Sequence, residues 1–226
     1  MKKTKILVIV AHPDDEILGC GGSIIKFSKK SIIKTVFTCK THDTRNNIKN
    51  SDDNEKRQII AKKVAKYLKI TKPTFLNYPG LKMSRNDTTK MAKSIYDEIL
   101  KFKPDIIFSH CIDDNHHDHR VTAEAVFIAT RPSSKTSYLK KIYSMEIPSA
   151  SDKLLSKKKS FNPNYFIDIK KTYKKKLEIL NKFYKKELRS YPNSMSLKSI
   201  KNQIKYRGNL VNLEFAETFE IIRIID

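Results

Sequence analysis

The sequence predicts an α/β fold of the Rossmann-like, doubly wound type, with a mainly parallel sheet and helices on both faces. Apolar runs rich in β-branched residues alternate with amphipathic segments of helical length, which is the pattern of right-handed βαβ units. The first apolar run carries no polar alternation, as expected of a strand buried on both faces. We therefore expect one domain over residues 1–226, with a catalytic core at 1–135 and an extension at 136–226 that completes it.

The first half of the chain alternates strands with helices. The predicted strands are residues 5–11, 33–39, 73–77 and 105–109. The predicted helices are residues 19–29, 55–68, 87–102 and 119–129, with a polar loop over 41–54. The helix over 55–68 repeats its apolar residues at helical spacing, so one of its faces should pack on a core. Gly19, Gly21 and Gly22 open the first helix and allow close packing of helix on strand.

The pattern changes after residue 140. The predicted strands of this half are residues 141–147, 165–169 and 219–225, and the predicted helices are residues 172–190 and 196–206. Neither a Gly-, Ser- or Pro-rich linker nor an internal repeat separates the two halves. The second half is therefore interpreted as an extension of the same domain.

The charge balance raises the question of an anionic partner. Lys and Arg number 46 and Asp and Glu number 24, which gives a net charge of +22. Nucleic acid, an acidic surface or an anionic substrate would each suit such a protein. Solvated lysine-rich helix faces explain the excess more simply, and the sequence has neither a known nucleic-acid-binding motif nor a platform of interleaved aromatic residues. Nucleic acid is thus disfavoured, while an anionic small molecule and a homo-oligomer stay open.

Cysteine usage and hydropathy indicate a cytoplasmic protein. Cys20, Cys39 and Cys111 are odd in number and widely spaced, which argues against disulfides and against a cysteine-based zinc site. The apolar run at residues 6–11 is too short for the core of a signal peptide, and a membrane span needs roughly 20 apolar residues. We therefore expect reduced thiols and no membrane span.

A first polar cluster follows the first predicted strand, where the sequence is Ala11-His12-Pro13-Asp14-Asp15-Glu16. Three carboxylates beside an imidazole repel one another at neutral pH unless a cation or a proton lies among them. An ordinary helix N-terminus, which favours acidic residues, explains the cluster equally well. A dinucleotide-binding turn is a third interpretation because of the glycines that follow, but the acidic residues would repel a pyrophosphate.

A second polar cluster, His116-His117-Asp118-His119-Arg120, follows the fourth predicted strand. Several histidines beside an aspartate are hard to bury, because each imidazole needs partners for its nitrogens. Ligands of doubly wound sheets bind beyond the carboxyl ends of the strands, and both clusters are predicted at that edge. A metal ion held by two histidines and an aspartate, with one position open, suits catalytic Zn²⁺ better than a structural site.

The two clusters resemble the signatures of a known enzyme family. His12-Pro13-Asp14-Asp15-Glu16 is similar to the first signature of the LmbE-like (PIG-L) deacetylases, and His116-x-Asp118-His119 is similar to the second. By this resemblance His12, Asp15 and His119 bind zinc, and Asp14 is the general base. His116 stabilises the tetrahedral intermediate, and Asp118 orients His116. The residues by themselves do not distinguish the role of Asp14 from that of Asp15.

The resemblance continues through much of the chain. Residues 143–149, 161–165, 207–208 and 215–219 are similar to members that act on N-acetylglucosamine-type sugars. Two segments depart from the family pattern: residues 41–44 lack the usual glycines, and Ile60 stands where many relatives carry Glu, three residues after Arg57. Both segments are expected to line or support the sugar pocket, with Arg57 as a substrate-binding residue.

The leading hypothesis from the sequence is metal-dependent hydrolysis of the acetamide of an N-acetylated amino sugar to a free amine and acetate. Zn²⁺ is the expected cofactor and Fe²⁺ the alternative ion. One rival is a zinc hydrolase that deacylates another amide or a lipid-linked sugar. The other rival, from a different class, is a basic nucleic-acid-binding protein.

Overall fold

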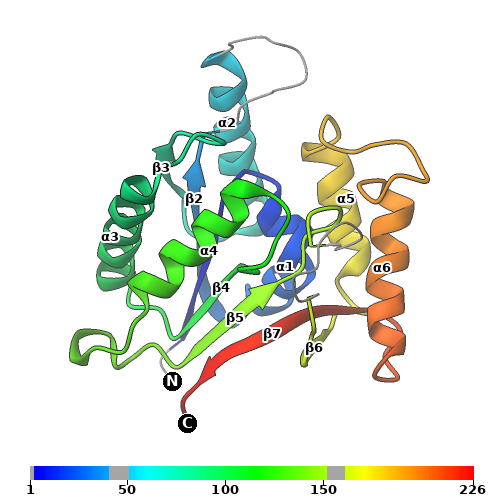
Figure 1. Cartoon of the computed structure of the whole chain (residues 1–226). Coiled ribbons are helices and arrows are strands. Elements are labelled where there is room, and N and C mark those ends of the chain that lie inside the picture. Colours follow the sequence, from blue (N-terminus) through cyan, green and yellow to red (C-terminus); the bar gives the residue numbers. More distant parts are fainter. Residues whose placement is uncertain (1–2, 41–50, 152–160) are drawn as a thin grey trace.

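The computed structural model describes residues 3–40, 51–151 and 161–226 (Figure 1). Its strands form one seven-stranded sheet in the order β3-β2-β1-β4-β5-β7-β6. They are β1 (Thr4–Val10), β2 (Ser31–Cys39), β3 (Thr74–Tyr78), β4 (Ile106–His110), β5 (Lys141–Met145), β6 (Tyr165–Asp168) and β7 (Ala216–Ile224). The helices are α1 (Asp15–Phe27), α2 (Ser51–Leu68), α3 (Arg85–Phe102), α4 (His117–Ala129), α5 (Tyr173–Phe183) and α6 (Leu197–Asn209), with a short 3-10 turn η1 (Ser134–Thr136). The predicted α/β class, with a mostly parallel sheet and helices on both faces, is confirmed.

The central strand β1 is buried on both faces, as its unbroken apolar run predicted. Ile6, Val8 and Val10 belong to one core cluster, whereas Leu7 and Ile9 belong to the other. Side chains alternate between the two faces of a strand, so one run of five residues supplies both cores. Helices α1, α2, α5 and α6 pack on the first core, and α3 and α4 pack on the second (Figure 1).

The strand order reverses between β1 and β4. The chain runs outward from β1 to β2 and β3, then returns through α3 to place β4 on the other side of β1. Strands β1, β2, β3, β4 and β5 are parallel, so the loops after β1 and β4 leave the sheet side by side at its carboxyl edge. This is the switch point at which doubly wound sheets bind their ligands.

The second half of the chain extends the sheet with strands of opposite direction. β7 pairs antiparallel with β5, and β6 pairs antiparallel with β7. The helices α5 and α6 of the same half cover the face that α1 also covers. Sheet and core are therefore continuous from the first half into the second.

Three predicted boundaries were wrong. Helix α1 begins at Asp15, not at Gly19, because the acidic residues Asp15 and Glu16 occupy its first turn, where the helix dipole favours them. Residues 51–54 belong to α2 rather than to a loop, and residues 41–50 lie outside the described part. Helix α5 ends at Phe183 instead of reaching residue 190. Beyond it the chain turns toward the carboxyl edge of the sheet, where Glu187 pairs with Arg57 of α2.

The glycines of α1 serve packing, as predicted, although they lie inside the helix. A Cβ atom on Gly19 would lie 2.5 Å from the sulfur of Met145 in β5, and one on Gly22 would lie 2.8 Å from Ile169. Side chains at these positions would push α1 away from the sheet and from the segment after β6. Glycine therefore sets the close approach of α1, and no nucleotide-binding loop is present there.

A buried ion pair joins α1, α5 and β7. The carboxylate of Glu217 accepts hydrogen bonds from the backbone N–H groups of Gly22 and Ser23 and from the Lys176 ammonium, each at 2.7 Å. Lys176 also donates to the carbonyl of Leu18 at 2.8 Å. Both charged side chains are about 1% exposed, so each depends on the other for its solvation.

Within the described residues, no helix combines the length and the apolar character that a bilayer crossing requires. Cys20, Cys39 and Cys111 are buried, and none of these three forms a disulfide.

We predict that Glu217→Gln destabilises the protein by about 3 kcal/mol, because it leaves the Lys176 ammonium buried without a counter-charge. The free energy of unfolding from guanidinium titration measures the effect. Glu214→Gln is the matched control, since Glu214 pairs with Lys170 on the exposed surface and should change stability very little. Equal losses in the two variants would contradict a structural role for the buried pair.

Candidate metal centre

The loop after β1 carries the first cluster to the carboxyl edge of the sheet. The backbone N–H of His12 donates to Oδ2 of Asp15 at 2.8 Å, so the loop curls over the first turn of α1. Asp14 occupies the N-cap position of α1, but its side chain makes no capping hydrogen bond. The backbone of this cluster therefore forms a helix N-terminus, which was one of the interpretations of the sequence. The Asp14 carboxylate does not cap that helix.

The loop after β4 carries the second cluster to the same edge. His116 is the N-cap residue of α4, and its backbone N–H donates to Oδ1 of Asp114 at 2.8 Å. Asp118 and His119 follow in the first turn of the helix, where both are buried. The second motif is thus held by a helix terminus that faces the terminus of α1.

The two clusters converge. Ligand nitrogens of His12, His116 and His119 lie within 4.8 Å of one another, and a second such group joins Asp15, His110 and His119. Nδ1 of His12 lies 3.6 Å from Oδ2 of Asp15, and Nε2 of His119 lies 3.4 Å from Oδ1 of the same carboxylate. Ligand atoms of a tetrahedral site with bonds of about 2.0–2.1 Å lie about 3.3 Å apart. Each of the two imidazoles thus lies at such a distance from an Asp15 oxygen, and the two imidazoles approach different oxygens of the carboxylate.

The charges of these groups depend on one another. Burial lowers the pKa of His12, but hydrogen bonds to Asp118 and Asp15 outweigh it and raise the value to about 9. Burial likewise opposes the charge of His119, and the carboxylates of Asp15 and Asp114 raise its pKa to about 10. Asp15 ionises in spite of its own burial, because the surrounding histidines hold its pKa well below the usual range.

Asp14 behaves in the opposite way. Burial, followed by repulsion from Asp15, raises the pKa of its carboxyl well above the usual range, while the nearby positive charge of Arg57 opposes the rise. The two adjacent aspartates therefore have different electrostatic properties, which the sequence could not show. One of them is ionised at the centre of the histidine cluster, and the other has a carboxyl of raised pKa at the cavity wall.

His116 is held as a neutral imidazole. Burial, with repulsion from His119 and His12, lowers its pKa to about 4. Nδ1 of His116 accepts a hydrogen bond from the backbone N–H of Asp118 at 3.2 Å, so the neutral ring carries its proton on Nε2. His116 therefore offers a hydrogen-bond donor to the cavity.

The family resemblance implied that Asp118 orients His116, but the Asp118 carboxylate contacts other groups. Its Oδ2 lies 2.9 Å from Nε2 of His12, and its Oδ1 accepts from the backbone N–H of Leu81 at 2.7 Å. A carboxylate on the far nitrogen of an imidazole fixes the ring and leaves the other nitrogen available to a metal. In this structure Asp118 therefore orients His12, and it contacts His116 only through its backbone.

Two residues of the centre were not identified from the sequence. The His110 ring stacks on His119 with centroids 4.0 Å apart, and its Nε2 accepts from the backbone N–H of Ala11 at 2.9 Å. Oδ2 of Asp114 lies 3.2 Å from Nδ1 of His119. Their position directly after the apolar run of β4 was the one available signal, because both contacts depend on the packing of distant segments.

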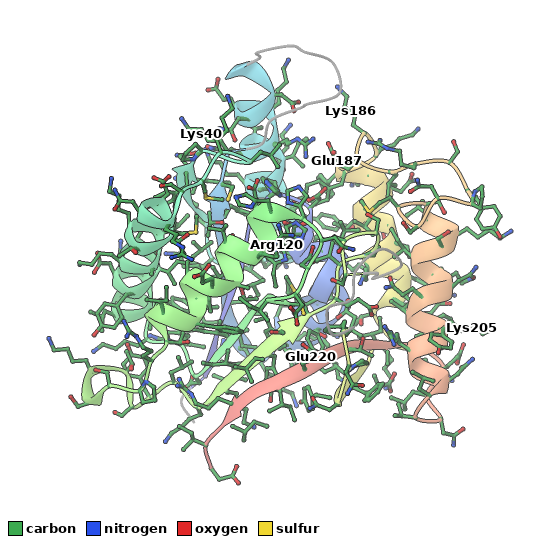
Figure 2. The ribbon with its side chains drawn as sticks, in the orientation of Figure 1. Lys40, Arg120, Lys186, Glu187, Lys205 and Glu220 are labelled. Atoms are coloured by element: carbon green, nitrogen blue, oxygen red, sulfur yellow. The ribbon has the colours of Figure 1, made fainter. Side chains whose placement is uncertain are left out.

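One cavity of about 350 Å³ unites the expected site residues. Its lining includes His12, Asp14, Asp15, Arg57, His116, Asp118 and His119. The second half of the chain contributes residues 147–150 together with Glu187, Arg189, Asn193 and Met195. Glu187 belongs to the segment after α5, at the end of the molecule toward which β2 and β5 point (Figure 2).

The residues expected to line or support the substrate pocket lie in different places. Arg57 lines the cavity, and its guanidinium is held by Glu187 at 2.8 Å and Asp53 at 3.3 Å. Ile60 packs against the hydrophobic core and is not part of the cavity lining, so the expectation that its segment forms the pocket holds for Arg57 alone. Residues 41–44 lie outside the described part of the chain.

Comparisons with known proteins agree with this geometry. The family model described as "PIG-L: GlcNAc-PI de-N-acetylase" matches residues 7–130. The fold is similar to N,N'-diacetylchitobiose deacetylase from Pyrococcus horikoshii, with 20% identity, a TM-score of 0.73 and coverage of 97% of this chain and 84% of that one. It is also similar to a deacetylase of teicoplanin biosynthesis, with 13% identity, a TM-score of 0.75 and coverage of 99% and 100%. A third similar structure is a 4-carboxy-2-hydroxymuconate hydratase from Pseudomonas putida, with 18% identity, a TM-score of 0.71 and coverage of 99% and 98%.

We predict that binding of Zn²⁺ releases about two protons per ion near pH 7. His12 and His119, with pKa values of about 9 and 10, are protonated there, and an imidazole must lose a proton to bind a metal. Affinity should therefore rise with pH until the pH passes these values. Calorimetry in buffers of different ionisation enthalpy counts the protons.

His117→Ala is the matched control for this measurement, because His117 belongs to the same motif but does not line the cavity. It should release as many protons as the wild type. Binding without proton release would contradict the pairing of these two histidines with one ion.

Proposed function

Since the chain belongs to the PIG-L (LmbE-like) family, we propose that it is a deacetylase that hydrolyses the acetamide of an N-acetylated amino sugar. The products are a free amine and acetate. The observation that carries the proposal is the convergence of both family motifs on one cavity, which is lined by His12, Asp14, Asp15, His116 and His119. Fold alone would not justify this conclusion, because similar folds serve different reactions.

We propose that His12, Asp15 and His119 hold Zn²⁺, with Fe²⁺ as the alternative ion. Nδ1 of His12 and Nε2 of His119 lie 3.6 and 3.4 Å from the two oxygens of the Asp15 carboxylate, and two imidazoles with a carboxylate are a donor set that zinc favours. A teicoplanin deacetylase of similar fold is described in a zinc-inhibited form, which supports the proposal of a metal in this chain. A bound divalent cation would polarise the amide carbonyl and lower the pKa of water.

The protein's own groups then divide the remaining work. Asp14, whose carboxyl has a raised pKa, takes the proton of the attacking water. His116 donates from Nε2 to the oxygen that becomes negative in the tetrahedral intermediate. Asp118 fixes the ring of His12 and so holds the ligand set in place. Protonated Asp14 returns its proton to the departing amine, which completes the hydrolysis.

The cavity supports a small sugar conjugate. Its volume of about 350 Å³ is near the lower end for small-molecule sites, and its wall offers polar side chains for hydroxyl groups. The net charge of +22 would attract an anionic aglycone over a distance. A cytoplasmic location is proposed because none of Cys20, Cys39 and Cys111 forms a disulfide.

The proposed substrate class is tested by metal analysis of the purified protein followed by a fluorescamine assay for released amine. We expect turnover of N-acetylglucosamine-type conjugates that is lost after chelation and restored by added metal. Aryl amides, peptide amides and a lipid-linked N-acetyl sugar complete the panel. Preference for one of these three would select the rival hydrolase, and tight polynucleotide binding at physiological salt without amidase activity would select the nucleic-acid-binding alternative.

Two substitutions test the division of roles. Asp14→Asn should keep the metal and lose turnover by a factor of at least about 100, because it removes the proton acceptor without touching a proposed ligand. His119→Ala should lose the metal itself. Metal content by plasma emission spectrometry and the amine-release assay give the two readouts. A metal content in Asp14→Asn as low as in His119→Ala would show that these roles are wrongly assigned.

A further inference from the structure

Asp14 has a backbone conformation that an L-residue rarely adopts. Its φ is 126° and its ψ is −34°, outside the regions that a Cβ atom permits. Such a conformation persists only when the surrounding structure enforces it, and it is concentrated at functional sites. The groups that hold Asp14 in place therefore determine where its carboxylate points.

The backbone N–H of Asp14 is held by Glu16. It donates to Oε2 of Glu16 at 3.0 Å, while the Asp14 carbonyl accepts from the N–H groups of Ile17 and Leu18 at 3.0 and 2.9 Å. The carbonyl bonds belong to the first turn of α1, and a helix of ordinary geometry would make them as well. The bond to Glu16 is the one that belongs to the unusual conformation.

Tyr184 fixes the Glu16 carboxylate. Its hydroxyl donates to Oε1 of Glu16 at 2.6 Å, and both side chains are buried. Neither residue belongs to the cavity lining, so neither touches a substrate there. The Tyr184 hydroxyl is thus connected to the cavity only through Glu16 and the backbone of Asp14.

Tyr184 lies where α5 ends and the cavity wall begins. It is the C-cap residue of α5, and Glu187, which follows it by one turn, lines the cavity and pairs with Arg57 at 2.8 Å. The segment after α5 is therefore linked to Asp14 twice: through the hydrogen bonds of Glu16 at the backbone, and through the charge of Arg57, which opposes the rise of the Asp14 pKa. Residues of the second half of the chain enforce the geometry of a motif near its beginning.

We propose that Tyr184 is a positioning residue for the reaction. Its hydroxyl orients Glu16, Glu16 holds the backbone of Asp14 at positive φ, and this conformation aims the Asp14 carboxylate into the cavity. The assignment rests on the proposed function of Asp14 as proton acceptor. If the role of Tyr184 were merely structural, its hydroxyl would only satisfy the buried carboxylate of Glu16. The turnover number would then not depend on the hydroxyl.

Tyr184→Phe tests the proposal, because it removes one oxygen and keeps the ring. We expect kcat to fall by about 10- to 100-fold, as for other orienting partners, with KM and metal content within twofold of the wild type. Tyr143→Phe is the matched control: Tyr143 is equally buried, lies in the aromatic cluster between β4 and β5, and does not line the cavity. Tyr143→Phe should keep kcat within twofold of the wild type, even if its melting temperature falls as much as that of Tyr184→Phe.

A pair of substitutions at Glu16 provides a second measurement, which also applies if Tyr184→Phe fails to fold. Glu16→Gln keeps an acceptor for the Asp14 N–H and should retain more activity than Glu16→Leu, which keeps none. Equal kcat values in Tyr184→Phe and the wild type, or equal losses in the two Glu16 variants, would overturn the proposal. Loss of metal in parallel with kcat in Tyr184→Phe would overturn it too.

A crystal structure of Tyr184→Phe separates this inference from the proposed function. We expect Asp14 to relax to negative φ and its carboxylate to turn away from the cavity. A positive φ with an unchanged carboxylate would overturn the positioning role whatever the activity. If the wild type hydrolyses no amide of the panel, the proposed function fails, and relaxation of Asp14 in the variant would still establish the conformational control.

Discussion

The parallel pairing of β1 with β4 is the contact on which the site depends. Ile6, Leu7 and Val8 are aligned with Ile106, Ile107 and Phe108, so the chain leaves both strands at the same height on the sheet. The first polar cluster follows one strand and the second follows the other, although about a hundred residues separate them in the sequence. Burial of the apolar strands on both faces fixes this register, because a shift by one residue would turn every side chain to the other core. Packing of the hydrophobic core thus positions the polar side chains of the two clusters, which are not part of that core.

Convergence of the two clusters buries negatively charged carboxylates close together, and protons or a cation must balance this charge. Asp15 is buried and ionised, and its charge is balanced by His12 and His119, whose pKa values rise to about 9 and 10. Two imidazolium charges therefore occupy the position at which a divalent ion would place the same total charge. Asp118 and Asp114, each in contact with the far nitrogen of one of these rings, stabilise either state. Asp118 and Asp114 are as much a part of this charge balance as Asp15.

The sequence was sufficient for the fold and for the motif residues that line the cavity, but not for the rest of the lining or for the contacts. Unbroken apolar runs identified β1 and β4, and polar residues directly after them identified the motifs, because both are local features. The end of α5 and the partner of Asp118 depend on segments that meet only in the folded chain. His110, Asp114 and Tyr184 escaped detection for the same reason: an isolated histidine, aspartate or tyrosine has no local pattern that reveals its partner.

The second half of the chain does more than complete the sheet. Similar folds include proteins named as deacetylases of different substrates and one named as a hydratase, so the shared sheet and its switch point leave the reaction undetermined. In this chain the segment after α5 supplies Glu187, Arg189 and Asn193 to the cavity wall. The same segment begins at the tyrosine whose hydroxyl supports the strained backbone of Asp14. Changes in this segment would therefore alter the cavity wall and the support of the Asp14 backbone together.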